Sequence, residues 1–170
     1  MKTRKSHHDI SSNARGNAGF SLIELLVVVA VILIIAAIAI PNYMKSKMRA
    51  NEASAAQNLR NVATAELVYS TTYGIDFSST LAQLSGTGIN PDQNNAGLID
   101  EVLASGIKSG YTITYTPLTF DPQGNPSTYS VTADPQVPGT TGSRHYYTDQ
   151  SCVIRWNDNV QAGPTDPAIQ

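Results

Sequence analysis

The sequence has 170 residues, of which 41% are hydrophobic, 14% charged and 7% aromatic, with a formal net charge of −2. A chain of this length suffices for one modest domain and not for two full ones. The single cysteine, Cys152, excludes a disulfide within the chain.

An aliphatic run dominates the first quarter of the sequence. From Leu25 to Ile40 every residue is Ala, Val, Ile or Leu, and the five residues from Phe20 to Glu24 extend the segment to 21. A helix of that length spans roughly 30 Å, the thickness of the hydrocarbon core of a bilayer. Residues 1–19 hold four basic residues and one acidic residue. The positive-inside tendency therefore places them in the cytoplasm, before a single membrane-spanning helix.

The residues alone leave three interpretations of this run. A secretory signal peptide would have a shorter apolar stretch, and a plain membrane anchor would not explain Glu24. A carboxylate toward the bilayer centre costs about 3 kcal/mol on insertion scales, so such a group usually has a partner. Cleavage between Gly19 and Phe20 would create an α-ammonium group four residues before Glu24. If Glu24 met that ammonium group on a neighbouring subunit, the pair would set the axial register between subunits.

The stretch "GFSLIELLVVVAVILIIAAIAIPNY" resembles the N-terminal segment of type IV pilins and the related pseudopilins over about 25 residues. The resemblance implies that a prepilin peptidase and methyltransferase cuts after Gly19 on the cytoplasmic side and N-methylates Phe20. It implies that Glu24 pairs with the Phe20 amine of a neighbouring subunit. It also implies an inner-membrane precursor and assembly platform, and an extracellular pilus or a periplasmic pseudopilus after assembly.

The helical pattern continues after Pro41, so we divide the helix into a membrane and assembly part, residues 20–41, and an amphipathic part, residues 42–73. Proline clashes with the carbonyl group four residues before it, so we expect a kink or local melting there; Pro41 could equally mark the end of the membrane span. Beyond it, apolar residues recur at spacings near 3.6, namely Met44, Met48, Ala55, Leu59, Val62, Ala63 and Leu67. One helix of roughly 50 residues ending near Ser70 is predicted.

Residues 74–110 are rich in turn-forming residues and form a predicted connecting region, with one short helix in residues 98–105 closed by Gly106. From residue 111 to residue 170 the apolar period changes to two. Four antiparallel strands are predicted, over residues 111–116, 128–133, 144–148 and 152–156. The predicted fold is α+β and pilin-like, with a long N-terminal helix packed on a small antiparallel sheet of about four strands.

Catalytic and metal-binding patterns are sparse. His145 and Cys152 lie on adjacent predicted strands, but no third group orients the histidine, so we predict no enzyme. Calcium could bind in the predicted turns that hold Asp121, Asp134, Asp149 and Asp158. Aspartate is also a common turn former, so we predict no cofactor and assign no ligand set. Beyond Ser70 three basic residues stand against nine acidic ones, so we expect no nucleic-acid partner.

The favoured function is that of a structural subunit of a type IV pilus-like filament, a homo-oligomer formed by bundling of the apolar helix halves with Glu24 setting the register. Many pilins close their C-terminal region with a cysteine pair, which the single Cys152 cannot supply. A pseudopilin of a type II secretion system is therefore the alternative. A monomeric membrane-anchored binding protein or enzyme is the alternative from another class, and it predicts indifference to Glu24→Ala.

Overall fold

The computed structural model describes residues 19–86 and 90–169. The chain divides into two compact units, the first ending at Ile40 and the second beginning at Pro41. Each unit is described by itself below. The predicted leader lies outside the described residues except for Gly19.

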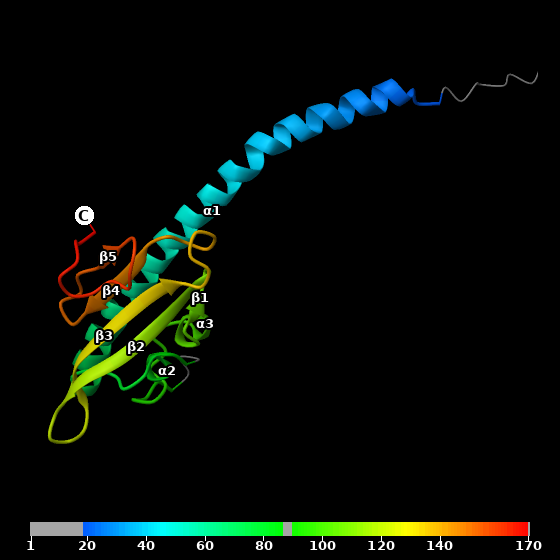
Figure 1. Cartoon of the computed structure of the whole chain (residues 1–170). Coiled ribbons are helices and arrows are strands. Elements are labelled where there is room, and N and C mark those ends of the chain that lie inside the picture. The colour runs from blue at the N-terminus through cyan, green and yellow to red at the C-terminus, as the bar shows by residue number, and fades with distance from the viewer. Residues whose placement is uncertain (1–18, 87–89, 170) are drawn as a thin grey trace, which may run out of the picture. The chain divides into compact units, whose positions relative to one another are not determined.

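Helix α1 runs from Leu22 to Tyr73, a length of 52 residues, and so crosses from the first unit into the second (Figure 1). The predicted long helix is confirmed, with its end three residues beyond the expected Ser70. The helix continues through Pro41 without interruption, so local melting there is not observed. A kink at Pro41 stays a prediction.

The first unit presents its apolar side chains outward. Among the described residues, α1 is the helix with the length and apolar composition needed to cross a membrane, and none of its most apolar 18-residue window is buried. Side chains from Leu22 to Ile40 are about half exposed or more almost throughout. Burying this surface requires a partner outside the chain, either lipid or protein.

In the second unit one face of α1 is buried, through Ala55, Ala56, Asn58, Leu59, Val62, Ala63, Ala65, Glu66 and Tyr69. The predicted apolar face is correct at Ala55, Leu59, Val62 and Ala63. It is wrong at Met44, whose side chain is 46% exposed, and at Leu67, whose side chain is 59% exposed. Glu66 is buried in its place because it follows Leu59 by seven residues, which is two helical turns and returns to the same face.

Two short helices form within the connecting region. Helix α2, Leu81–Leu84, was not predicted; Thr80 caps its N-terminus by accepting a hydrogen bond from the Gln83 N–H, and both leucines are buried. Helix α3, Glu101–Ala104, confirms the short helix expected in residues 98–105. Asp100 caps α3 through the Leu103 N–H, and Gly106 follows it with a φ of +78°.

The sheet has five antiparallel strands in the order β1-β2-β3-β4-β5 (Figure 1). They are β1 (Ile107–Lys108), β2 (Tyr111–Phe120), β3 (Pro126–Pro135), β4 (His145–Asp149) and β5 (Arg155–Asn157). The fifth strand, beyond the four expected, is the two-residue β1, which pairs with the start of β2. A strand this short carries no periodicity that the sequence could reveal.

Strands β2 and β3 are longer than predicted because the turn between them is shorter. Pro117 was expected in a loop, yet it pairs with Tyr129 inside β2. Since β1 pairs only with Tyr111 and Thr112, no strand among the described residues lies on the other side of Pro117, and its missing N–H costs the sheet no hydrogen bond.

Strand β5 begins at Arg155 and not at Cys152 as predicted. Cys152 has a φ of +58°, and its N–H donates to the Asp149 carbonyl oxygen at 2.9 Å. That left-handed conformation places Cys152 in the turn after β4, outside the ladder.

The core of the second unit lies between α1 and one face of the sheet. Alternate residues of β2 and β3 are buried, and with Tyr146 of β4 they meet the buried face of α1; the sheet residues are Tyr111, Ile113, Tyr129, Val131, Ala133 and Tyr146. The α+β, pilin-like prediction of a long helix packed on an antiparallel sheet is confirmed.

Candidate assembly site

The start of α1 carries the residues that the sequence predicts for cleavage and assembly. Gly19 and Phe20 precede the helix, and the Phe20 side chain is 86% exposed. A Cβ atom at Gly19 would meet no heavy atom within 4 Å, so the described residues leave this position open. Pro41 lies 21 residues after Phe20 along the chain.

Glu24 lies in the first turn of α1, where its Oε2 accepts a hydrogen bond from the Ser21 N–H at 2.9 Å. The first N–H groups of a helix have no partner within the helix, and a carboxylate there also interacts favourably with the helix dipole. The other oxygen, Oε1, has no hydrogen-bond partner among the described residues. Glu24 can therefore accept a second donor while it keeps its contact with Ser21.

The second unit fastens α1 to the loop between β3 and β4 by polar contacts near residue 52. The Glu52 Oε1 atom accepts hydrogen bonds from the N–H and the hydroxyl group of Ser143, both at 2.9 Å. The Asn51 side-chain amide donates to the Thr141 carbonyl oxygen at 2.8 Å. These contacts join residues about 90 positions apart and fix the exposed face of α1 relative to the sheet.

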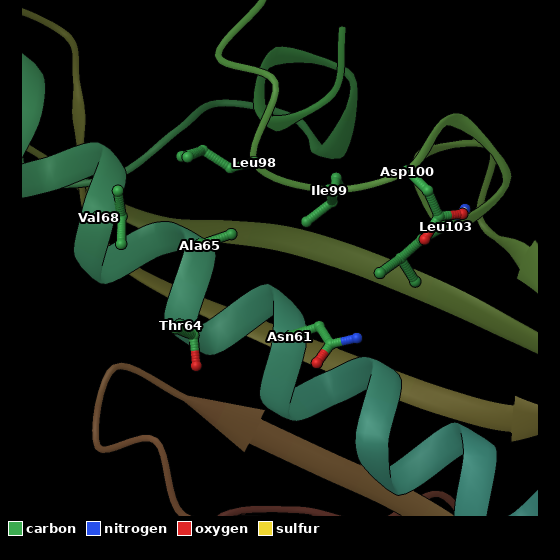
Figure 2. A pocket seen from close by; sticks show the side chains of 8 residues that line it. All are labelled: Asn61, Thr64, Ala65, Val68, Leu98, Ile99, Asp100 and Leu103. Atoms are coloured by element: carbon green, nitrogen blue, oxygen red, sulfur yellow. The ribbon is translucent and has the colours of Figure 1, made fainter. Parts of the chain in front are cut away.

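A cavity of about 290 Å³ lies between α1 and the segment that leads into α3 (Figure 2). Asn61, Thr64, Ala65 and Val68 approach it from α1, and Leu98, Ile99, Asp100 and Leu103 from the other side. Its one carboxylate, Asp100, caps α3 and pairs with Lys108 at 2.7 Å, which lowers the Asp100 pKa. The cavity therefore has no uncommitted acid or base for catalysis.

The structure does not pair His145 with Cys152, because Cys152 is an exposed turn residue. The absence of a Cys–His pair agrees with the sequence analysis, which assigned this pair no catalytic role. His145 instead has its Nδ1 atom 2.6 Å from the Asp134 Oδ1 atom. The side-chain amide of Gln161 donates to the other oxygen of Asp134 at 2.9 Å. This polar cluster ties β3, β4 and the C-terminal segment together.

The aspartates considered for calcium serve separate local contacts. Asp121 accepts hydrogen bonds from the N–H groups of Gln123 and Asn125 within the β2–β3 turn. Asp149 accepts a hydrogen bond from the Ser151 N–H. Asp158 forms an ion pair with Arg144, and Asp134 contacts His145. No group of three potential metal-ligating side chains occurs in the part of the chain that the structure describes.

Glu66 is a buried polar residue that the sequence analysis missed. Its side chain is fully buried and accepts hydrogen bonds from the Ser78 N–H at 3.0 Å and from the Ser78 hydroxyl group at 2.5 Å. Burial raises its pKa above the ordinary value, while the bonds from Ser78 act in the opposite direction. Its seven-residue spacing from Leu59 was the available signal, but a carboxylate is rarely assigned to a core.

Comparison with known proteins identifies the family to which the chain belongs. Residues 14–40 match the family described as the prokaryotic N-terminal methylation motif. Two fimbrial proteins from Pseudomonas aeruginosa are each 36% identical over 115 residues, which is 58% of this chain and 75% of theirs. The chain belongs to the type IV pilin family. Membership of this family of structural proteins confirms the prediction that the chain is not an enzyme.

Two further pilins match over shorter stretches. The type IV major pilin protein PilA of Myxococcus xanthus is 52% identical over 50 residues, 29% of this chain and 23% of the relative. The type IV wide pilus major component PilA4 of Thermus thermophilus is 53% identical over 38 residues, 22% of this chain and 29% of the relative. The names of these relatives favour a pilin over the pseudopilin alternative.

Proposed function

We propose that this pilin is the structural subunit of a type IV pilus-like extracellular filament, made as an inner-membrane precursor with its N-terminus in the cytoplasm. One observation carries the proposal. The first unit is an aliphatic helix whose surface is unburied within the chain, and it bears Glu24 at its start. A bilayer can cover this surface before assembly, and the same surface of neighbouring helices can cover it afterwards.

Processing by a prepilin peptidase and methyltransferase would remove residues 1–19 and methylate Phe20. The match over residues 14–40 spans this junction, and Gly19 and Phe20 are exposed and lie outside α1, which leaves the peptide bond between them open to an enzyme. The new α-ammonium group would sit one residue before Ser21, the residue that Glu24 contacts.

Glu24 would then pair with the Phe20 ammonium group of a neighbouring subunit. A lone carboxylate among aliphatic helices is penalised more than a pair, and the Oε1 atom of Glu24 is available as an acceptor. Apolar packing along residues 20–41 would drive bundling, while the charge pair would select one axial register.

Each of the remaining parts of the subunit would have its own structural role. Residues 42–73 would continue the helix into the globular part, residues 74–110 would connect helix and sheet, and residues 111–170 would form the outer sheet region. An inner-membrane assembly platform is the further partner we propose, and Pro41 is the proposed position of a helix kink.

Substitution of Glu24 tests the proposal most directly. Cells producing the wild-type chain, Glu24→Ala, Glu24→Gln or the control Ser21→Ala are sheared, and the released material is examined by electron microscopy and intact mass. Ser21→Ala keeps the backbone N–H that Glu24 contacts, so we expect wild-type filaments from it. Both Glu24 variants should be inserted and cut at Phe20, yet release at least about tenfold fewer filaments, the equivalent of about 1.4 kcal/mol.

The remaining outcomes separate the alternatives. Normal filaments from Glu24→Ala would contradict the register pair. A chain cut at Phe20 that stays in the membrane fraction would indicate the short pseudopilus of a secretion system. A wild-type chain that is never cut would overturn the whole proposal.

A further inference from the structure

Charge is unevenly distributed over the second unit. The exposed side of α1 carries a basic segment, residues 45–60, with Lys45, Lys47, Arg49 and Arg60 against the single acid Glu52. The following part of the chain is an acidic region, residues 74–86 and 90–110, with Asp76, Asp92, Asp100 and Glu101 against the single base Lys108. The net charges are +3 and −3, although the whole chain is close to neutral.

The basic segment has little neutralisation from its own chain. Among the described residues, none of its four cations has a carboxylate within 4.0 Å. Glu52 is committed to Ser143 and to the Arg144 N–H, and Arg144 takes Asp158. Two neighbouring hollows of about 390 and 440 Å³ open beside the segment, and Arg49 and Arg144 line both. Glu52 also lines both hollows and Asp158 lines one, but these carboxylates already contact Ser143 and Arg144. The cations of the basic segment in the linings therefore remain available to an anionic partner.

Two of the four carboxylates in the acidic region are not engaged by a neighbouring cation. Asp100 pairs with Lys108, and Asp92 accepts hydrogen bonds from Asn94 and Asn95. Asp76 and Glu101 are exposed, and neither has an ion pair among the described residues. The two surfaces thus have unsatisfied charges of opposite sign.

Each surface also exposes apolar side chains beside its charges. Tyr43 and Met44 adjoin the basic segment and are 69% and 46% exposed. Val102 and Ile107, in and just after α3, are 57% and 52% exposed in the acidic region. Apolar groups surrounded by charges of matching pattern are the usual composition of a protein interface.

We propose that the basic segment of one subunit binds the acidic region of a second copy of this chain, an inference that rests on the proposed filament. The two surfaces are centred at different levels of α1. The acidic region contacts α1 from Ser54 to Tyr69, and the middle of that range lies about 9 residues, or roughly 14 Å, beyond the middle of the basic segment. A second copy shifted along the helix axis by that distance brings opposite charges to the same level, and the contact repeats from copy to copy without closing.

Charge reversal on each surface tests this contact in the full-length chain. Lys47→Glu with Arg49→Glu reverses the basic segment. Asp76→Lys with Glu101→Lys reverses the acidic region while keeping the ion pair and helix cap of Asp100 and the turn hydrogen bonds of Asp92. Each pair of substitutions should lower filament yield by about tenfold, because like charges then face each other. The chain with all four substitutions should recover most of the yield. The control Lys47→Arg with Arg49→Lys keeps the charge and should assemble normally.

The amount of processed, protease-resistant subunit in the membrane fraction is measured in the same cells, so that loss of folding is seen separately. Wild-type filaments together with normal filaments from both reversals would overturn the contact and leave the proposed function standing. No filaments from the wild type would instead remove the proposed function. If the basic reversal depletes the membrane fraction and the fourfold variant stays depleted, the basic segment serves lipid headgroups and the proposal is wrong.

Discussion

Replacing Ser78 with alanine tests the polar contact that joins the connecting region to α1. Ser78 is fully buried, and its hydroxyl group donates to the Glu66 Oε1 atom at 2.5 Å. Its carbonyl oxygen accepts a hydrogen bond from the Tyr115 hydroxyl group of β2 at 2.8 Å. Ser78 therefore links the helix to the sheet, and its side chain supplies one of the two donors to Glu66.

The expected loss follows from the chemistry of that contact. A hydrogen bond to a charged group contributes about 1.5–3 kcal/mol, and a buried carboxylate oxygen left without a donor retains its desolvation cost. We expect Ser78→Ala to lower the free energy of unfolding by about 2 kcal/mol above the folded-state pKa of Glu66, where the carboxylate is ionised. For a unit of this size that corresponds to a melting temperature lower by roughly 6–10 °C.

The effect depends on pH through Glu66. Burial raises the Glu66 pKa above its ordinary value of 4.5, so between that value and the folded-state pKa the folded chain holds a proton that the unfolded chain has lost. The contribution of Glu66 to stability is therefore largest below 4.5, declines as pH rises through this window, and is constant above the folded-state pKa. Glu66→Gln has no proton to lose and should lack this decline.

Thermal unfolding of the full-length chain in detergent, followed by near-ultraviolet circular dichroism across this pH range, measures all three proteins. The stability of Glu66→Gln relative to the wild type should increase with pH. Ser78→Ala should lose more stability above the folded-state pKa of Glu66 than below it, because its missing donor served the ionised carboxylate. Parallel pH curves for wild type and Glu66→Gln would refute the reasoning, since they would mean that Glu66 titrates alike in both states.

Two further substitutions address the packing of the sheet. Gly142→Ala should lower the free energy of unfolding by about 1–3 kcal/mol, because its Cβ atom would clash with the hydroxyl oxygen of the buried Tyr111. Gly163→Ala is the matched control, since its nearest heavy atom is 4.0 Å away; equal melting temperatures for the two variants would contradict the clash. Thr148→Val should be neutral or stabilising by up to about 1 kcal/mol, because the fully buried Thr148 hydroxyl group has no hydrogen-bond partner among the described residues. A clear loss of stability in the same assay would show that the hydroxyl group has a partner.

The long helix and the alternating strands could be predicted because their patterns extend over many residues. The repeated spacing of Ala55, Leu59 and Val62 indicated the buried face of α1, and the alternation of Tyr111 and Ile113 indicated β2. The exact members of the buried face were harder to predict. Helical spacing turns Glu66 inward and Leu67 outward, and the carboxylate is satisfied there because Ser78, twelve residues away in a loop, supplies two donors.

The boundaries of the sheet depended on contacts between distant residues. Pro117 belongs to β2 only because β1 ends before reaching it, and β1 is too short to predict. Cys152 lies outside β5 because of its left-handed backbone conformation, which its residue type does not favour. The contact between Asp134 and His145 likewise requires the pairing of β3 with β4 before the two side chains can meet.

The candidate assembly residues could be predicted because the motif that contains them is contiguous in the sequence, unlike the sheet boundaries, which depend on distant contacts. Gly19, Phe20 and Glu24 fall within six consecutive residues, and the aliphatic run follows directly. The basic segment and the acidic region were not recognised, although their charged residues can be counted in the sequence. Their significance appears only when the fold shows which carboxylates are already committed to local contacts.

The single cysteine is the departure from many pilins, and the structure shows how this chain closes its C-terminal region without a disulfide. The Ile169 N–H donates to the Ile154 carbonyl oxygen at 2.8 Å, and the Trp156 N–H donates to the Pro167 carbonyl oxygen at 3.0 Å. The Arg155 guanidinium group donates to the Asp166 backbone carbonyl oxygen at 2.8 Å. Three such bonds contribute about 3 kcal/mol together, which is comparable with the 2–4 kcal/mol of a typical disulfide. Ile169 also packs against the core. Since the closure rests on these contacts, the lone Cys152 is compatible with the pilin fold, and reducing conditions should leave this closure intact.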